Sequence, residues 1–487
     1  MLEARDLVFS YEGTQPILEK VTMQLHPREI VLLTGPTGSG KSTLAKCLSG
    51  FIPRMIKGDY SGSVFIENKD VSDLLLSEYA EKVALVQQDP DGQICTLNVG
   101  DEVAFGPENY CKDTKEIERL VESSLSSVSS WHLRNRSTHK LSGGEKQRII
   151  IAAMLASEPD YLILDESSSS LDPKGTLELR DVLVAMKENN LGILCIEHQL
   201  SAFLPIADRI LQISEGKVIE TPQNKTFSAD IPQKSSGMIR IENPEEVIRI
   251  ENTTFSYGKQ IAVNQVSLIL NRGDFVALMG DNGSGKTTLL SMIAGLLEPS
   301  IGKVFLNRKS ISSFAKREIA KRIGVVFQNP NHQIFERTVW KEQVLGLEVL
   351  EYDMEENLDN AKNVLDAMGL SPYSERNPFS LSHGQKRRLN VSSVTLHEPE
   401  VYLFDEPFIG QDADGRRIIA EKMTRRVETG GICVVVTHDP TFAREFCNRI
   451  LFMENGSILL DGSPQAVQDR LQEIGKPEYT AQGGQSE

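Results

Sequence analysis

The chain has 487 residues, of which 40% are hydrophobic and 25% are charged, a length and balance that suit two to four globular domains. The formal net charge of -16 argues against a general nucleic-acid binder, although it leaves room for a local basic groove. Six scattered cysteines without a C-x-x-C pair favour buried thiols over disulfides or zinc ligands. No run approaches 18 apolar residues and the N-terminus is no signal peptide, so we expect a cytosolic protein that reaches a membrane only through a partner.

The first predicted element with chemistry is a glycine-rich loop between a strand and a helix. It follows the apolar run 30–33 and reads Gly35, Pro36, Thr37, Gly38, Ser39, Gly40, Lys41, Ser42 and Thr43. This is the P-loop pattern G-x4-G-K-[ST] in its strand–loop–helix context. The glycines let backbone N–H groups surround phosphate oxygens, and the helix N-terminus favours negative charge. We expect Lys41 to reach the outer phosphates and Ser42 to hold Mg²⁺.

The same motif returns in the second half of the chain, after the apolar run 275–279. It reads Gly280, Asp281, Asn282, Gly283, Ser284, Gly285, Lys286, Thr287 and Thr288. One match could arise by chance, but two matches in the right context would not be expected. The chain therefore is predicted to bind nucleotide twice.

Further motifs recur in the same order, which predicts one unit written twice. They are Phe9–Tyr11 with Phe255–Tyr257, Gln88 with Gln328, Leu141–Glu145 with Leu381–Gln385, Asp165-Glu166 with Asp405-Glu406, and His198 with His438. A polar, proline-containing stretch separates the copies. The predicted organisation is domain 1 at 1–222, a linker at 223–245, domain 2 at 246–474 and a disordered tail at 475–487. Continuous apolar runs such as 161–164 and 432–436, separated by helical patterns, predict parallel sheets covered on both faces.

The order P-loop, Gln, Leu-Ser-Gly-Gly, Asp-Glu and His resembles the nucleotide-binding domain of ABC-family ATPases over nearly all of both halves. The resemblance implies an α/β fold with two tandem P-loop NTPase (ABC ATPase) domains. Each would have a RecA-like, mostly parallel sheet core, a helical subdomain and an N-terminal antiparallel β region. It also implies ATP and Mg²⁺ as ligands, and ATP hydrolysis coupled to transmembrane transport.

The resemblance assigns roles to the paired residues. Asp165 and Asp405 end apolar strands, where ligand sites of parallel sheets lie, and would complete the Mg²⁺ shell with Ser42 or Thr287. The remaining assignments follow the family: Glu166 and Glu406 polarise the attacking water, Gln88 and Gln328 touch Mg²⁺ or water, His198 and His438 contact the γ-phosphate, and Tyr11 and Tyr257 stack on adenine. The plain alternatives are turn-capping carboxylates, surface histidines and core aromatic residues.

The signature motifs are Ser142, Gly143, Gly144 and Glu145 in the first half, and Ser382, His383, Gly384 and Gln385 in the second. In the family, two domains pack head to tail, so each P-loop would work with the signature of the other half within this one chain. The halves differ, because His383 stands where the family has Gly and Ser167 stands where Pro407 keeps the family's Pro. We therefore expect two competent but unequal ATP sites.

An Asn/Asp-Pro-x-x-Gln-Ile segment follows the Gln in both halves, at Gln88–Ile94 and Gln328–Ile334, and resembles energy-coupling-factor (ECF) importers of prokaryotes. The chain would then lie on the cytoplasmic face of the membrane, bound to a transmembrane coupling protein and a membrane-embedded substrate-binding subunit. The cargo would be a vitamin, metal or other micronutrient, with thiamine or its pyrimidine precursor as a candidate. The alternative is a soluble twin-ABC ATPase acting on ribosomes or nucleic acid. The short polar linker and the lack of Cys-rich insertions favour the importer.

Overall fold

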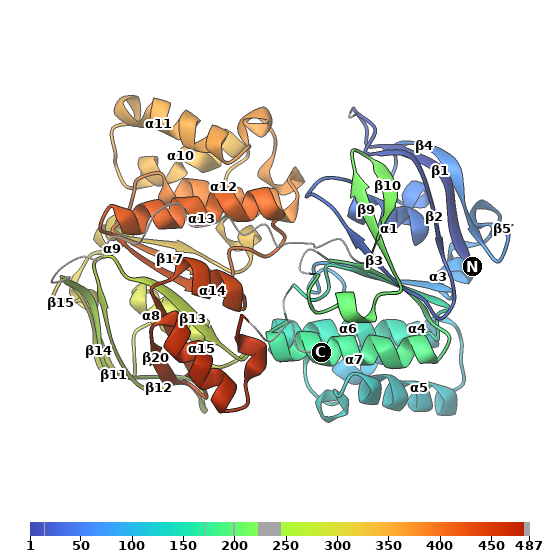
Figure 1. The fold of residues 1–487 in the computed structure, drawn as a ribbon, viewed down its shortest axis with the longest axis horizontal. Coiled ribbons are helices and arrows are strands. Elements are labelled where there is room, and N and C mark those ends of the chain that lie inside the picture. The colour runs from blue at the N-terminus through green and yellow to red at the C-terminus, as the bar shows by residue number, and fades with distance from the viewer. Residues whose placement is uncertain (14, 170, 198–199, 223–244, 482–487) are drawn as a thin grey trace. The chain divides into compact units, whose positions relative to one another are not determined.

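The computed structural model describes residues 1–13, 15–169, 171–197, 200–222 and 245–481. The chain divides into two compact units, Met1–Ala229 and Asp230–Glu487, whose elements are labelled in Figure 1. Each unit contains a four-stranded sheet and a six-stranded sheet. The predicted linker at 223–245 lies outside the described residues except for Glu245.

The first unit, domain 1, begins with an antiparallel sheet in the order β2-β1-β4-β5. Its strands are β1 (Leu2–Ser10), β2 (Leu18–Leu25), β4 (Asp59–Ile66) and β5 (Lys69–Asp70). The second sheet has the order β10-β9-β3-β8-β7-β6 and is parallel except for the edge strand β10. Its strands are β3 (Ile30–Thr34), β6 (Val83–Val86), β7 (Tyr161–Asp165), β8 (Gly192–Ile196), β9 (Arg209–Ser214) and β10 (Lys217–Thr221).

The central strands of domain 1 are apolar along their whole length because both faces of the sheet are covered. Residues of one face, such as Leu32 and Ile193, share a core with residues of the long helices. Residues of the other face, such as Leu33 and Leu194, pack with α1 and the antiparallel sheet. The helices are α1 (Lys41–Leu48), α2 (Phe51–Arg54), α3 (Leu76–Ala80), α4 (Val99–Asn109), α5 (Thr114–Ser127), α6 (Gly143–Leu155) and α7 (Pro173–Glu188), with 3-10 turns η1 (Val71–Asp73), η2 (Trp131–Leu133), η3 (Thr138–Lys140) and η4 (Leu204–Ile206).

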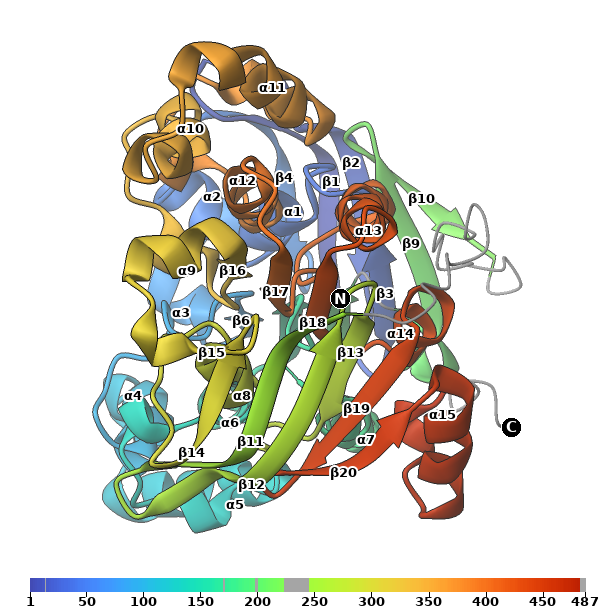
Figure 2. The same ribbon diagram turned by 90° about the vertical axis from the view of Figure 1, so that its left-hand side faces the viewer.

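The second unit, domain 2, repeats this plan with sheets in the orders β12-β11-β14-β15 and β16-β17-β18-β13-β19-β20 (Figure 2). The antiparallel sheet contains β11 (Glu246–Tyr257), β12 (Gln260–Asn271), β14 (Ile301–Leu306) and β15 (Lys309–Ser310). The mainly parallel sheet contains β13 (Phe275–Gly280), β16 (Ile323–Val326), β17 (Val401–Asp405), β18 (Ile432–Val436), β19 (Arg449–Glu454) and β20 (Ser457–Gly462). The predicted fold class is confirmed in both halves.

The helices of domain 2 follow the same order, with additional ones at its C-terminal end. They are α8 (Lys286–Ile293), α9 (Lys316–Arg322), α10 (Val339–Val349), α11 (Met354–Ala367), α12 (His383–Thr395), α13 (Ala413–Glu428), α14 (Pro440–Phe446) and α15 (Pro464–Glu473), with 3-10 turns η5 (Ile311–Ser313), η6 (Pro330–Gln333), η7 (Ser371–Tyr373), η8 (Pro378–Ser380) and η9 (Pro477–Tyr479). Among the residues described here, no helix is both long and apolar enough to cross a membrane.

The C-terminal end differs from the sequence-based expectation, which placed a disordered tail from residue 475. The described part, up to Ala481, packs on domain 2 through Tyr479, whose side chain is fully buried. The Tyr479 ring contacts Phe452 edge-on at 5.0 Å, and its hydroxyl donates a 2.6 Å hydrogen bond to Asp281 Oδ1. The polar composition of the segment suggested disorder, but Tyr479 and the 2.8 Å ion pair between Lys476 and Glu454 hold its described part on domain 2.

Candidate functional site

Both P-loops present uncapped helix N-termini. α1 begins after Gly40 and α8 after Gly285, each glycine in the left-handed region with φ of 106° and 99°. No side chain caps either helix. This arrangement suits a phosphate.

The first glycine of each loop is required by close packing. A Cβ on Gly35 would lie 2.1 Å from the Ile213 carbonyl oxygen, and one on Gly280 would lie 2.1 Å from that of Met453. Ile213 is on β9 and Met453 is on β19, the strands beside β3 and β13. Each loop therefore lies so close to the neighbouring strand that only glycine fits at its first position.

The P-loop lysines lie across their own loops. Lys41 Nζ donates to the carbonyl oxygens of Gly35 and Pro36 at 2.8 and 2.9 Å. Lys286 Nζ donates to those of Gly280 and Asp281, both at 2.8 Å. The ammonium groups are thus held at the loop, where they would neutralise a bound phosphate.

A hydroxyl and a carboxylate meet at the end of β7 and of β17. Thr287 Oγ1 donates to Asp405 Oδ2 at 2.7 Å, and the Ser42 side chain makes the matching bond to Asp165. Burial raises the pKa of Asp165 to about 6, with the Glu166 charge adding to it and the Ser42 bond opposing it. Burial likewise raises the pKa of Asp405.

These oxygen donors fit Mg²⁺, which takes carboxylate, hydroxyl and water oxygens. Within the described parts of the chain, Asp165 Oδ1 is buried without a hydrogen-bond partner. A buried carboxylate with an open oxygen is costly unless it is compensated. A cation or its bound water would supply that compensation.

The next residues, Glu166 and Glu406, both adopt left-handed backbone conformations, with φ of 51° and 49°. Glu166 N donates to Ile196 O at 2.9 Å, and Glu406 N donates to Val436 O at 3.1 Å, so each is tied to the neighbouring strand. A non-glycine residue in this region is strained and persists where its surroundings fix it. Equivalent pairs elsewhere, such as Glu158 and Glu398, share this conformation, so it is the place of Glu166 and Glu406 directly after the buried aspartates that makes them candidates for catalysis.

The two glutamates have different side-chain partners. Glu166 Oε2 accepts a 2.6 Å hydrogen bond from Gln88 Nε2, whereas Glu406 Oε1 lies 3.3 Å from His438 Nε2. Burial lowers the pKa of His438 to about 3, with the Lys286 charge acting in the same direction, so the imidazole is neutral and Nε2–H can donate. Burial raises the pKa of Glu406, and the Asp405 charge adds to it. His198, the counterpart of His438, lies outside the described residues.

The tyrosines predicted to stack on adenine also differ. The Tyr11 hydroxyl lies 3.3 Å from Thr43 Oγ1 in the P-loop motif, whereas Tyr257 is 58% exposed. Each packs edge-on against the preceding phenylalanine, Phe9 or Phe255. Tyr11 is therefore placed beside its P-loop helix, and Tyr257 has a largely open ring.

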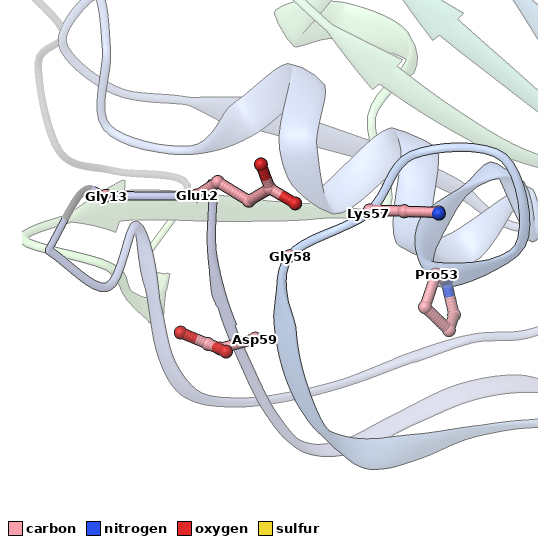
Figure 3. Close-up of a pocket in the computed structure, with 6 residues that line it drawn as sticks. All are labelled: Glu12, Gly13, Pro53, Lys57, Gly58 and Asp59. Atoms are coloured by element: carbon pink, nitrogen blue, oxygen red, sulfur yellow. The ribbon is translucent and has the colours of Figure 1, made fainter.

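A cavity of about 500 Å³ opens beside the Tyr11 segment (Figure 3). Its lining comes from the two residues after Tyr11 and from the extra length of the first half: Glu12, Gly13, Pro53, Lys57, Gly58 and Asp59. Figure 3 shows the charged side chains of Glu12, Lys57 and Asp59 around it.

The signature motifs form the N-termini of α6 and α12. Ser142 and Ser382 are N-caps, and each exchanges hydrogen bonds with the third helical residue, Glu145 or Gln385. Gly384 is constrained, because a Cβ there would lie 2.3 Å from the Gly410 carbonyl oxygen. The Gln411 amide donates to Gly384 O at 2.9 Å, which joins this signature to the loop after Glu406.

One buried side chain beside the second site was not predicted. Arg387 on α12 is fully buried, and its guanidinium donates to the carbonyl oxygens of Phe327 and Gln328. Burial lowers its pKa to about 10, which the charges of Asp405 and Glu406 oppose. Its counterpart in domain 1 is Gln147. The sequence shows the run Lys386-Arg387-Arg388, but it does not show that the side chain of Arg387 is buried.

Comparisons with known proteins agree with this geometry. A family model described as "ABC transporter" matches residues 18–169 and 263–409. A Bacillus subtilis protein named "Putative HMP/thiamine import ATP-binding protein YkoD" is 33% identical over 95% of this chain and 92% of its own length. A Methanosarcina mazei "Putative ABC transporter ATP-binding protein" is 34% identical over 96% of this chain and 90% of its own length.

Solved structures show a similar fold over most of the chain. One titled "RNase-L Inhibitor" has a TM-score of 0.64 and 20% identity, covering 97% of this chain and 93% of that one. Another, "Model of ribosome-bound archaeal Pelota and ABCE1", has a TM-score of 0.71 and 19% identity, covering 97% and 82%. At such identities the likeness establishes the fold alone.

Proposed function

This chain belongs to the ABC transporter family and carries two fused ATPase regions, and on that premise we propose that it is the energy-coupling subunit of a prokaryotic ECF-type importer. It would hydrolyse ATP at the cytoplasmic face of the membrane, bound to a transmembrane coupling protein and a membrane-embedded substrate-binding subunit. The proposal keeps the head-to-tail pairing of the two halves that the family resemblance implies.

The observation that carries the proposal is the loop after each Gln, which is built the same way in both domains. In domain 1 the Gln93 amide bridges Gln87 N and Leu85 O at 2.9 and 2.7 Å. In domain 2 the Gln333 amide bridges Phe327 N and Val325 O at 2.8 and 2.7 Å. The Gln of the Pro-x-x-Gln-Ile segment therefore closes the loop onto the preceding strand.

A buried glutamate fixes the residues that follow. Glu102 accepts from the backbone N–H groups of Cys95 and Thr96, and Glu342 accepts from those of Phe335 and Glu336. Close to these anchors, Leu97 is 71% exposed and Phe335 is 74% exposed. In the proposed complex, these two side chains would be covered by helices of the coupling protein.

The chemistry proposed for each site uses the residues described above. Glu166 and Glu406 would polarise the attacking water, and the raised pKa of Glu406 suits a base that accepts a proton near neutral pH. Lys41 and Lys286 would neutralise the transferred phosphate. Mg²⁺ held by Ser42 and Asp165, or by Thr287 and Asp405, would neutralise further phosphate charge.

The proposed cargo is a micronutrient, with thiamine or its pyrimidine precursor as the candidate. The support is the 33% identity to the relative named for HMP/thiamine import. An ATPase does not touch the cargo, so uptake must be measured directly.

The test is co-expression of this chain with any polytopic membrane proteins encoded in the neighbouring reading frames, followed by purification in detergent. We expect a stable complex, ATPase activity that is lost in Glu166→Gln/Glu406→Gln, and ATP-dependent uptake of labelled thiamine or its precursor into vesicles. Recovery with ribosomes and without any membrane protein would instead support the soluble twin-ABC alternative. Uptake of another solute would support the importer proposal and contradict the proposed cargo.

A further inference from the structure

A buried carboxylate in domain 1 has no role in the chemistry described above. Glu197 directly follows β8 and is only 2% exposed. Its Oε1 accepts the backbone N–H of Ser168 at 3.1 Å, and its Oε2 accepts the Ser168 hydroxyl at 2.7 Å. One side chain thus accepts from both hydrogen-bond donors of a residue two positions after Glu166.

Two consecutive residues at the end of β8, Ile196 and Glu197, hold the two ends of the segment 166–168. Ile196 O accepts the N–H of Glu166 at 2.9 Å, and the Glu197 carboxylate holds Ser168. The turn is closed by Ser169 N donating to Glu166 O at 3.2 Å. Because Glu166 is in the left-handed region, where a non-glycine residue is strained, such fixation helps to hold it there.

Domain 2 fixes the corresponding turn by other means. Pro407 and Phe408 stand in place of Ser167 and Ser168, and Thr437 stands in place of Glu197. The Phe408 ring packs against Phe442 with a centroid distance of 4.6 Å. Thr437 Oγ1 accepts from Asp439 N at 3.1 Å, within its own segment.

The two sets of residues are alternative ways of holding the same turn. Proline fixes its own φ, so the turn in domain 2 is restricted by covalent geometry and by aromatic packing. Serine has no such restriction, and the partly buried Ser168 is held by hydrogen bonds instead. The carboxylate of Glu197 supplies both the partner and the restriction.

We propose that Glu197 is a positioning residue for catalysis in domain 1, holding the turn that carries Glu166 through its two hydrogen bonds to Ser168. The inference rests on the proposed function, in which Glu166 polarises the attacking water. Glu197 itself acts through Ser168 and does not touch the substrate.

The test measures kcat and KM for ATP with the full chain in a Glu406→Gln background, so that the turnover measured is that of the domain 1 site. Glu197→Thr, which places the domain 2 residue in domain 1, should lower kcat roughly tenfold with little change in KM, because misplacement of a catalytic group affects the chemical step. Glu197→Gln should stay within about twofold of that background, because its amide oxygen can accept from Ser168 N and its NH₂ can donate to Ser168 Oγ. Thr437→Ser is the matched control in domain 2.

A second set of variants introduces the corresponding domain 2 residues into the turn of domain 1. Ser167→Pro/Ser168→Phe/Glu197→Thr should recover part of the activity lost in Glu197→Thr. Ser168→Ala, which removes one bond and is mild enough to fold, should lower kcat by about twofold to fivefold. Thermal melting identifies variants that do not fold, and for those Ser168→Ala and Glu197→Gln carry the test.

Each result decides one point. Unchanged kcat in Glu197→Thr or in Ser168→Ala would overturn the positioning role. Equal losses in Glu197→Gln and Glu197→Thr would also overturn it, since hydrogen bonding would then not matter. If wild type does not hydrolyse ATP, or if Glu166→Gln/Glu406→Gln leaves hydrolysis unchanged, the proposed function itself is wrong.

Discussion

The two ATPase domains share their catalytic motifs but hold them with different side chains. In domain 1 the glutamate after β7 is bonded by Gln88, and its turn is held by Glu197. In domain 2 the glutamate after β17 lies beside His438, and its turn contains Pro407. A repeated motif therefore does not imply a repeated environment, and the rate at each site depends on the residues around it.

The segment after each Gln is closed by the same amide bridge in both domains, but its contacts with the signature helix differ. In domain 2, side chains of helix α12 donate to three backbone carbonyl oxygens of this segment. Arg387 donates to two of them, and Asn390 donates to that of Pro330 at 2.9 Å. In domain 1, helix α6 has Ile150 in place of Asn390 and holds its segment through the Lys146–Asp91 ion pair, whose Asp91 is 60% exposed. Exposed ion pairs contribute little, so the segment of domain 2 is bound more firmly to its signature helix.

The largest expected effect comes from removing the catalytic carboxylates one at a time. With the membrane partners present, Glu166→Gln and Glu406→Gln should each lower ATPase activity, by about 10²-fold or more at the faster site. Because the supporting contacts differ, the two losses should be unequal. Equal losses would remove the asymmetry, and Glu188→Gln on the exposed end of α7 is the control.

Arg387→Gln, which gives domain 2 the residue of domain 1, should destabilise domain 2 by about 2–5 kcal/mol. Two backbone carbonyls lose a buried donor, and the shorter amide cannot reach both. Denaturant unfolding followed by intrinsic fluorescence would measure the loss. The neighbouring Arg388→Gln, at a half-buried position, should cost less than about 1 kcal/mol, and an equal cost would contradict the comparison.

Glu197→Gln should change how the stability of domain 1 depends on pH. Burial raises the pKa of Glu197 to about 8, Ser168 opposes this, and the charges of Glu166 and Asp165 add to it. A carboxyl whose pKa is raised on folding favours the folded state below pH 4.5, and this contribution is lost as the pH rises through 8. The variant should therefore nearly match wild type at pH 4.5 and exceed it at pH 9 by about 5 kcal/mol, since the shift is roughly 3.5 units at 1.36 kcal/mol each.

The measurement is nucleotide-free unfolding across that pH range. Thr437→Ser in domain 2 carries no titratable group and should show the same pH dependence as wild type. A variant advantage that grows toward acid pH would contradict the sign of the Glu197 shift.

The smallest expected effect concerns the tyrosines before the P-loops. Tyr11→Leu should weaken ATP binding by roughly fivefold, as expected for loss of one stacking contact of about 1 kcal/mol. Tyr257→Leu should have a smaller effect, because its largely exposed ring is not held by a hydroxyl contact such as that between Tyr11 and Thr43. Titration with a fluorescent ATP analogue would measure both, and equal effects would mean that the two rings are used alike.

Local patterns in the sequence were enough to predict the two α/β domains, the P-loops and the carboxylates at strand ends. The apolar run 161–164 followed by Asp165 and Glu166 defines a buried strand and its functional end, and the repeat in the second half confirms the pattern. The roles of these residues remain predictions.

Contacts between distant segments could not be predicted in the same way. Ser168 meets Glu197 only because β7 and β8 are parallel neighbours with Asp165 opposite Ile196. Gln147 and Arg387 occupy the same place in one helix pattern, and only burial shows that the arginine points inward. The anchoring of Tyr479 depends on β19 and the second P-loop, which are far from it in sequence.

The hydrogen bond from Tyr479 to Asp281 depends on a residue that the first P-loop lacks. Pro36 occupies the place of Asp281 in the first loop and offers no carboxylate. Recombination that copied the first loop into the second would remove the acceptor of a buried hydroxyl, at a cost of about 1–3 kcal/mol. The C-terminal anchor thus makes the second P-loop less interchangeable with the first.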